Sequence, residues 1–169
     1  NKNYASATNH IKLIDTINNS VVYGHYGEIH KSKDSAIITK RAMSMYVIEN
    51  DSLFIHADTL VITGEEKKRI LRGYYDVRIF KSNIRGKSDS IYFEENTGNI
   101  ELIKKPLDRK ELQIFTEEDK NLRNPILWFG ESQMTGNKIF LLSKLESKKL
   151  DSLKIIGDAF IIEKDSIDN

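Results

Sequence analysis

The sequence predicts an all-β domain, and two observations carry that prediction. Apolar residues alternate with polar ones, as at Leu60 and Ile62 or Ile139 and Leu141, which is the period of a strand with one buried face. Turn signals separate the alternating runs, so roughly ten to a dozen short strands are expected. Short strands joined by regular turns are typical of a sandwich, a barrel or an open roll.

Length and composition limit the possible functions. The 169 residues, 39% of them hydrophobic, predict one domain over residues 1–169. The 26 basic and 25 acidic side chains nearly cancel, so no net field favours nucleic acid as a partner. The absence of cysteine excludes disulfides, thiolate nucleophiles and cysteine zinc sites. No apolar run reaches the ~18–20 residues of a membrane span, and because the chain starts at Asn1 we expect a processed or trimmed piece of a longer chain.

Several alternating runs begin with the same short pattern, an Asp or Asn followed by a small or polar residue and then apolar residues. Asp and Asn are poor strand residues but bond nearby backbone N–H groups, so each copy is interpreted as turn chemistry at a strand entrance rather than as a catalytic acid. The expected strand entrances are Asp34, Asp51, Asp58, Asp89, Asn137, Asp151 and Asp158.

Turns and one irregular segment complete the expected order of elements. Residues 90–102 predict a hairpin around Glu95–Gly98 in which Phe93 faces Ile100 and Ile91 faces Leu102. Further turns are expected at residues 63–66, 129–132 and 143–152. The charged stretch 104–124 shows little alternation, and we interpret it as a surface excursion with one helical turn near 116–122.

One twelve-residue frame occurs twice, as DSLFIHADTLVI at 51–62 and DSLKIIGDAFII at 151–162. In both copies an Asp starts the frame and a second Asp stands at the eighth position. Alternation predicts inward side chains at Leu53, Ile55, Leu60 and Ile62, and in the second copy at Leu153, Ile155, Phe160 and Ile162.

Four segments in order resemble the OstA-like family, which includes the lipopolysaccharide-transport proteins LptA and LptC and the N-terminal domain of LptD. These segments are residues 24–60, 84–103, 125–139 and 151–162, about two-thirds of the chain. The resemblance is carried by the Gly-Lys-Ser-Asp start at Gly86, the Thr97-Gly98 turn, the PILW run from Pro125 and the QMTGNKI run. The length of 104–124 departs from the family pattern and leaves the shape of one groove rim open.

The resemblance implies an antiparallel β-jelly-roll, a folded-over sheet that stays open along one side and holds lipid acyl chains in its interior. It implies a periplasmic module that transports lipopolysaccharide, with lipopolysaccharide or a similar glycolipid, other Lpt-type proteins and end-to-end copies as partners. No enzyme activity, cofactor or metal is expected. A repeated frame suits this function, because a trough for a long lipid needs the same cross-section along its axis.

The inward residues of the alternating runs are the candidate lining of that trough. They are Leu53, Ile55, Leu60, Ile62, Ile91, Phe93, Ile100, Leu102, Leu127, Phe129, Ile139, Leu141, Ile155 and Phe160.

The sequence offers little for other chemistry. It contains none of the nucleotide-loop, metalloprotease or serine-hydrolase motifs. The four histidines (His10, His25, His30 and His56) are spaced too loosely for a local metal motif, although folding can still gather two of them. The basic run at 67–72 is interpreted as solvated, with lipid phosphate as the alternative.

Trp128 stands in a strand whose two faces are both apolar. Alternation places Trp128 with Ile126 on one face and Leu127 with Phe129 on the other. Core packing is the favoured interpretation for Trp128, and a lipid mouth or a protein contact is the alternative.

Two other functions stay open. The first is a structural module that joins neighbours through its edge strands and binds no lipid. The second is a carbohydrate-active β-sandwich enzyme, which would require a carboxylate pair in a cleft.

Overall fold

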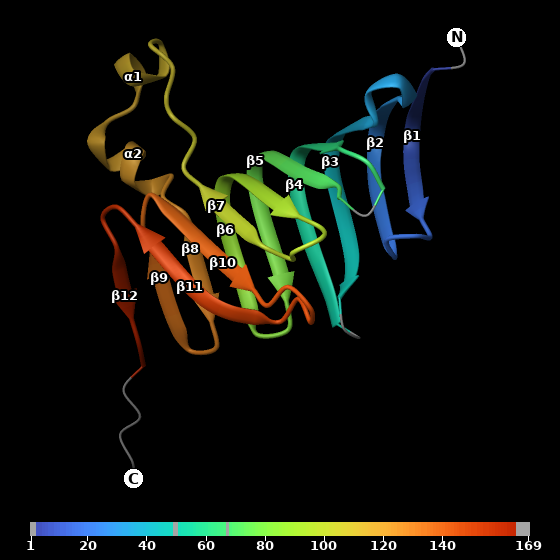
Figure 1. The fold of residues 1–169 in the computed structure, drawn as a ribbon. Helices are drawn as coiled ribbons and strands as arrows, with labels where there is room; N and C mark the ends of the chain where they lie inside the picture. Colours follow the sequence, from blue (N-terminus) through green and yellow to red (C-terminus); the bar gives the residue numbers. More distant parts are fainter. Residues whose placement is uncertain (1–2, 49–50, 67, 165–169) are drawn as a thin grey trace.

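The strands of this protein form one antiparallel sheet that is folded over on itself. The computed structural model describes residues 3–48, 51–66 and 68–164, and Figure 1 shows the strands following one another along the molecule. The elements are β1 (Tyr4–Asp15), β2 (Ser20–His30), the 3₁₀ turn Lys31–Lys33, β3 (Ser35–Ile48), β4 (Asp51–Thr63), β5 (Ile70–Lys81), β6 (Ile84–Glu94), β7 (Ile100–Ile103), α1 (Glu111–Ile114), α2 (Glu117–Leu122), β8 (Ile126–Phe129), β9 (Ser132–Thr135), β10 (Lys138–Ser143), β11 (Leu150–Ile156) and β12 (Phe160–Ile162). Within this described part, neither helix is long and apolar enough to cross a membrane.

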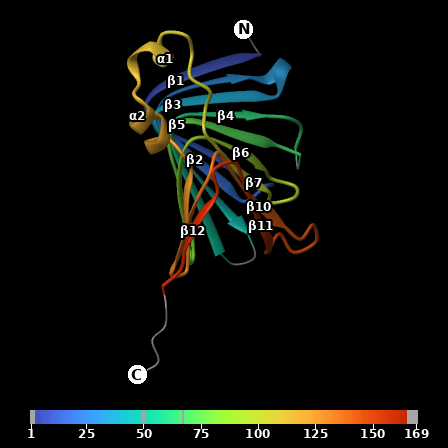
Figure 2. The ribbon, with the colours of Figure 1, turned by 90° about the vertical axis from the view of Figure 1, so that its left-hand side faces the viewer.

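The long strands bend in their middle because β1, β3 and β5 each carry a two-residue bulge. Across the pairs β1–β2, β3–β4 and β5–β6, two residues face one: Asn9 and His10 face His25, Lys40 and Arg41 face Asp58, and Tyr75 and Asp76 face Asp89. All six bulged residues have positive φ. A bulge of this kind bends the strand that carries it, so the aligned bulges turn the whole sheet along one line (Figure 2).

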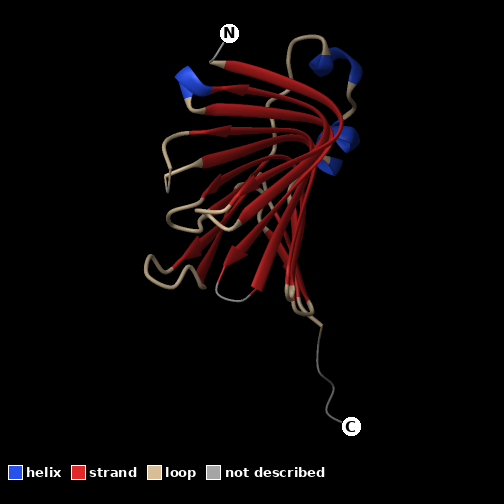
Figure 3. Cartoon of the chain, turned by 90° about the vertical axis from the view of Figure 1, so that its right-hand side faces the viewer, coloured by secondary structure: helices blue, strands red, loops and turns tan. Residues whose placement is uncertain are grey.

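The bend divides the sheet into two layers, which Figure 3 shows meeting at one side. Layer A consists of residues 4–8, 26–30, 35–39, 59–63, 70–74 and 90–94 together with β7, β10 and β11. Layer B consists of residues 11–15, 20–24, 42–48, 51–57, 77–81 and 84–88 together with β8, β9 and β12.

Strand β6 is where the two layers take different partners. Its C-terminal half pairs with β7, and its N-terminal half pairs with β8. Beyond β6, layer A therefore continues through β10 and β11, whereas layer B continues through β9 and β12. The sheet is open, and β1, β11 and β12 each pair with one neighbour within the described residues.

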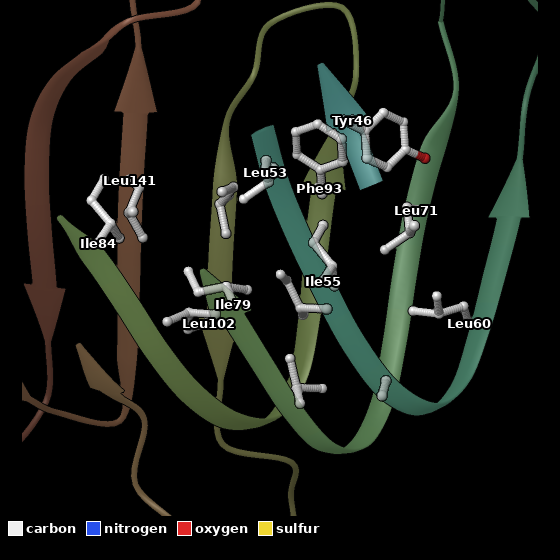
Figure 4. Packing of buried hydrophobic residues seen from close by; sticks show 14 of the residues in the cluster. Tyr46, Leu53, Ile55, Leu60, Leu71, Ile79, Ile84, Phe93, Leu102 and Leu141 are labelled. Atoms are coloured by element: carbon white, nitrogen blue, oxygen red, sulfur yellow. The ribbon is translucent and has the colours of Figure 1, made fainter. Parts of the chain in front are cut away.

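Side chains that face inward form continuous rows across the strands. One row of layer A runs through Ile29, Ala36, Ile62, Leu71, Phe93, Ile100, Leu141 and Leu153. A row of layer B faces it through Leu13, Val22, Ser44, Ile55, Ile79, Gly86, Leu127 and Met134. Most of these side chains belong to one buried cluster between the layers (Figure 4).

The excursion 104–124 lies on the bend side of the molecule and not at the open side (Figure 3). Arg123 pairs with Asp89 at 2.7 Å, and the Lys105 ammonium donates to the Tyr75 hydroxyl at 2.7 Å. The excursion therefore packs beside the β5–β6 bulge while it carries the chain from layer A to layer B. The excursion contains two short helices, α1 of four residues and α2 of six, whereas the sequence predicted one helical turn.

The predicted hairpin is confirmed in register, with Phe93 opposite Ile100 and Ile91 opposite Leu102. The turns expected at 63–66, 129–132 and 143–152 all separate consecutive strands. Asp34, Asp51, Asn137, Asp151 and Asp158 lie at or within two residues of a strand start, as predicted.

Two strand entrances were predicted wrongly. Asp58 and Asp89 lie inside β4 and β6, each as the single residue opposite a two-residue bulge. The expected short strands are accordingly joined into long bent ones of 11 to 14 residues in β1 to β6. Aspartate is found both at strand starts and opposite bulges, because regular strand pairing is interrupted at both kinds of position.

The repeated frame marks a crossing between layers in both copies. Residues 51–62 pass from layer B to layer A through β4, with Asp58 at the bend. Residues 151–162 pass from β11 in layer A to β12 in layer B. The two strands are separated there by a turn that contains Gly157 and Asp158, which both have positive φ. The second Asp of the frame thus occupies the crossing point each time.

Candidate functional site

The candidate site is the space between the inner faces of the two layers, which is filled in its middle and open near β1. Leu60, Ile55 and Leu102 in the middle have no exposed surface. The rings of Tyr46 from layer B and Phe93 from layer A meet edge to face, with centroids 4.9 Å apart (Figure 4). Side chains of the protein therefore fill the interior over β4 to β7.

Toward β1 some inward side chains are small, and the layers leave a cavity of about 540 Å³. Ala36 in layer A and Ser20 in layer B stand where larger residues stand on later strands. The apolar part of the lining includes Leu13, Val22, Ile29, Ala36 and Ile62, and polar and charged side chains make up the rest. This volume falls within the ~300–1,000 Å³ of typical ligand sites, so strands β1 to β4 provide a partly apolar recess for a small part of a ligand.

Glycine lets neighbouring strands come close on either side of the first bend. A Cβ added to Gly27 would lie 3.2 Å from the Ile11 side chain, and one added to Gly24 would lie 2.3 Å from the Ile38 side chain. Both positions face inward on β2. A larger residue at Gly24 would force the buried Ile38 to move, so glycine keeps the inner wall intact beside the bend.

An ion pair joins Asp15 of layer B to Arg69, which directly precedes β5 of layer A, and both residues line the cavity. Asp15 also accepts hydrogen bonds from the backbone of Ile17 and from the backbone and side chain of Asn18. Burial raises the pKa of Asp15, but these hydrogen bonds and the Arg69 charge outweigh it and leave the pKa below its ordinary value. The pair therefore holds the two rims together as a charged contact.

A buried carboxylate, Glu95, lies beside this ion pair. Its residue is 6% exposed, and neither carboxylate oxygen has a hydrogen-bond partner among the described residues. Its backbone is fixed, because its N–H donates to the Arg69 carbonyl at 3.0 Å and its carbonyl accepts from Lys148 at 2.6 Å. Burial, followed by the negative charge of Asp15, raises the pKa of Glu95 to about 7.

The structure places thirteen of the fourteen predicted lining residues in or against the buried cluster between the layers. Phe129 and Ile155 pack against it while partly exposed, and the remaining eleven are buried members: Leu53, Ile55, Leu60, Ile62, Ile91, Phe93, Ile100, Leu102, Leu127, Ile139 and Leu141. Of these, Ile62 lines the cavity itself. The others form the filled part of the interior.

Phe160 was predicted to face inward, and that prediction is wrong. Phe160 is 60% exposed and pairs with Thr135 at the edge formed by β9 and β12. Ile162, given the same inward orientation, is 51% exposed. Ile161, not Phe160, pairs with the inward Met134, so odd-numbered positions keep the inward side from β11 to β12. The change of phase at Asp58 in the first copy of the frame does not recur at Asp158.

Sequence reasoning missed most residues of the cavity. Leu13, Val22, Ile29 and Ala36 stand on β1 to β3, where the small residues Ala, Ser and Gly weaken the alternating pattern. Two contacts join elements that are far apart in sequence, namely the ring contact of Tyr46 with Phe93 and the ion pair of Asp15 with Arg69. Arg69 belongs to the basic run interpreted as solvated, and its pairing with Asp15 corrects that interpretation.

Trp128 is not part of the core, contrary to the favoured prediction. Its strand neighbour Leu127 is fully buried, so Trp128 faces outward from layer B. The indole Nε1 donates to the Gln133 side chain at 2.9 Å.

The histidines form one close pair. The rings of His10 and His25 lie 5.3 Å apart at the first bulge, and His30 contacts Glu28 at 3.2 Å on the outer face of layer A. Within the described residues, no three side chains of His, Asp or Glu gather in a metal-binding group.

Comparison with solved structures finds a similar fold. The crystal structure of LptH from Pseudomonas aeruginosa, the LptA-homologous periplasmic component of its lipopolysaccharide transport device, aligns with a TM-score of 0.65 at 6% sequence identity. The alignment covers 88% of this chain and 99% of LptH. No protein-family model and no curated protein matches the sequence. At this identity the likeness shows the fold, an open antiparallel roll of the LptA type.

Proposed function

We propose that this protein is a periplasmic lipopolysaccharide-transport module that shelters acyl chains of lipopolysaccharide or a similar glycolipid between its two layers. The single observation that carries the proposal is the cavity of about 540 Å³ between the layers near β1, which is lined by aliphatic side chains together with polar and charged ones. The fold shared with LptH, a component of such a transport device, supports the same function.

The cavity offers an acyl chain an aliphatic surface beside charged groups. Its lining includes the aliphatic side chains of Leu13, Val22, Ile29, Ala36 and Ile62, together with the acids Asp15, Asp34 and Glu66 and the bases Lys31 and Arg69. An acyl chain buried against that aliphatic surface gains about 0.8 kcal/mol per CH₂, whereas a headgroup near the rim can meet Arg69 and Lys31. Access to the filled interior farther along would require the side chains of the core, including Tyr46 and Phe93, to separate.

The test fills the cavity without adding charge. Ala36 faces inward on β3, and its neighbour Ile37 faces outward. Ala36→Phe is expected to weaken binding of a fluorescent lipopolysaccharide at least tenfold, because the ring occupies the recess, whereas Ile37→Phe adds a ring outside and should leave binding unchanged. Circular dichroism establishes that both variants are folded. Undiminished binding by folded Ala36→Phe would place the lipid elsewhere and overturn the proposal.

Assembly through edge strands is a second candidate function, which the open sheet favours. β1 is the edge strand at one end of the roll, and β11 and β12 are the edge strands at the other. Each has one pairing partner in the described chain. An unpaired strand edge is a template for pairing with a further strand. Copies, or other Lpt-type proteins, would then stack end to end, with or without lipid, and the oligomeric state in solution tests this.

A further inference from the structure

The outer face of layer B carries exposed apolar and basic side chains together. Cross-strand pairing aligns Ile14, Val21, Met45, Phe54, Phe80 and Trp128 in one outward row, with Arg85 between Phe80 and Trp128. Ile14 is 61% and Phe80 is 43% exposed. Ile14 also lines the cavity near β1, whereas the other side chains of the row lie on the face away from it, so the proposed lipid site does not account for them.

All charged residues at the paired outward positions of layer B are basic. They are Lys12, Arg78, Arg85 and Lys87. The outer face of layer A differs, because it mixes acids with bases and pairs Glu101 with Lys138 at 2.7 Å. Charge of one sign therefore distinguishes layer B, although the chain as a whole has a net charge of only +1.

The basic and aromatic residues converge on a hollow of about 740 Å³ at β5, β6 and β8. Arg78, Arg85, Lys87, Phe80 and Trp128 line it, and no carboxylate is among its lining residues. The Arg85 guanidinium lies 5.8 Å from the Phe80 ring centre, and Phe80 lies 6.3 Å from Phe54. Arg78 has one acidic contact, with Asp76 at 3.1 Å at the bend.

We propose that the outer face of layer B docks on the surface of an anionic phospholipid bilayer, with lipid phosphates at the basic hollow and Trp128 in the headgroup region. Charge complementarity selects an anionic partner, because the paired outward positions offer cations without acids. Indole and phenyl rings beside Arg and Lys are the side chains that favour a membrane interface. An extended apolar row on a sheet face can enter the headgroup layer without a matching protein shape.

The chain supplies its own reporter for the test, since Trp128 is its single tryptophan. Vesicles of phosphatidylglycerol and phosphatidylethanolamine should shift Trp128 emission to the blue, and lipids brominated in the acyl chain near the headgroup should quench it. Phosphatidylcholine vesicles should do neither. Raising the salt from about 0.05 to 0.5 M should weaken binding, because it screens exposed charges.

Charge reversal on the two layers provides the matched comparison. Arg85→Glu combined with Lys87→Glu is expected to weaken vesicle binding more than tenfold, since each basic residue near an anionic surface contributes about fivefold. Lys154→Glu changes an exposed charge on the outer face of layer A and should change binding little. Ala36→Phe, which fills the cavity, should bind vesicles like the parent, so the outcome is independent of lipid held between the layers.

Three results would overturn this proposal. The first is an emission spectrum that phosphatidylglycerol vesicles leave unchanged at low salt, which would point to an acidic protein as the occupant of the same face. The second is equal binding to phosphatidylcholine, and the third is undiminished binding by the folded Arg85→Glu, Lys87→Glu variant.

Discussion

Glu95 is the residue whose chemistry is least expected from its place in the sequence. It belongs to a turn, where carboxylates are ordinarily solvated, yet the hairpin between β6 and β7 buries it near Asp15 and Arg69. A buried carboxylate without hydrogen bonds is far less costly when protonated. Its protonation state therefore links the stability of this rim to pH.

Glu95→Gln is expected to stabilise the protein at pH 8 and to have little effect near pH 4.5. The folded pKa of Glu95, about 7, lies above its ordinary value of 4.5. The protonated group thus contributes stability that is fully present below pH 4.5 and is lost as pH rises toward 7. Such a shift corresponds to about 3 kcal/mol at high pH.

Urea unfolding of both proteins at pH 4.5, 6 and 8 measures this difference. The control is Glu65→Gln, in an exposed turn, which should show no comparable trend. If the free energies of unfolding of the parent and of Glu95→Gln differ by the same amount at every pH, the pKa of Glu95 is the same in the folded and the unfolded protein.

At the scale of elements, the bulges decide where each strand lies. Alternation in β4 changes phase from Leu53 and Ile55 to Leu60 and Ile62, and that change marks the bend at Asp58. In β5 the phase is the same on both sides, since Leu71 and Ile79 both face inward at odd positions. A strand with two bulged residues keeps its inward side chains at the same parity, whereas its partner, with one residue at the bend, changes parity. The sequence pattern therefore reveals the bend in β2, β4 and β6 but not in β1, β3 and β5.

The edge strands should produce concentration-dependent self-association. β1 presents a twelve-residue edge, and β11 presents a seven-residue edge at the other end. Multi-angle light scattering is expected to show a mass that rises with concentration, and Ser152→Pro in β11, which removes one backbone N–H, should lower it. A constant monomer mass up to millimolar protein would count against edge-strand assembly.

At the scale of the whole molecule, the interior has a cavity near β1 and is filled by side chains over the later strands. Ala36 and Ser20 stand near the cavity, whereas Leu102, Phe93 and Leu141 fill the later strands. One folded sheet thus combines a stable core with a space that its own side chains leave empty.

This difference in packing predicts unequal costs for two truncations. Leu102→Ala removes a side chain with no exposed surface and should destabilise by about 2–5 kcal/mol, because it opens a new cavity in close packing. Ile29→Ala, which widens an existing cavity, should cost roughly 1 kcal/mol, since fewer contacts are lost there. Denaturant unfolding measures both, and equal costs would mean that the recess near β1 is as tightly packed as the core.

The sequence by itself determined the all-β class, the hairpin register from Ile91 to Leu102 and the inward side of thirteen of the fourteen residues predicted to line a trough. These features depend on neighbours within one strand or one hairpin, where alternation and turn chemistry act locally. Only the tertiary structure decided that Asp58 and Asp89 mark bends, that Phe160 faces outward and that Asp15 meets Arg69. Those outcomes depend on which distant strand supplies the partner, and the local alternation does not show which strand that is.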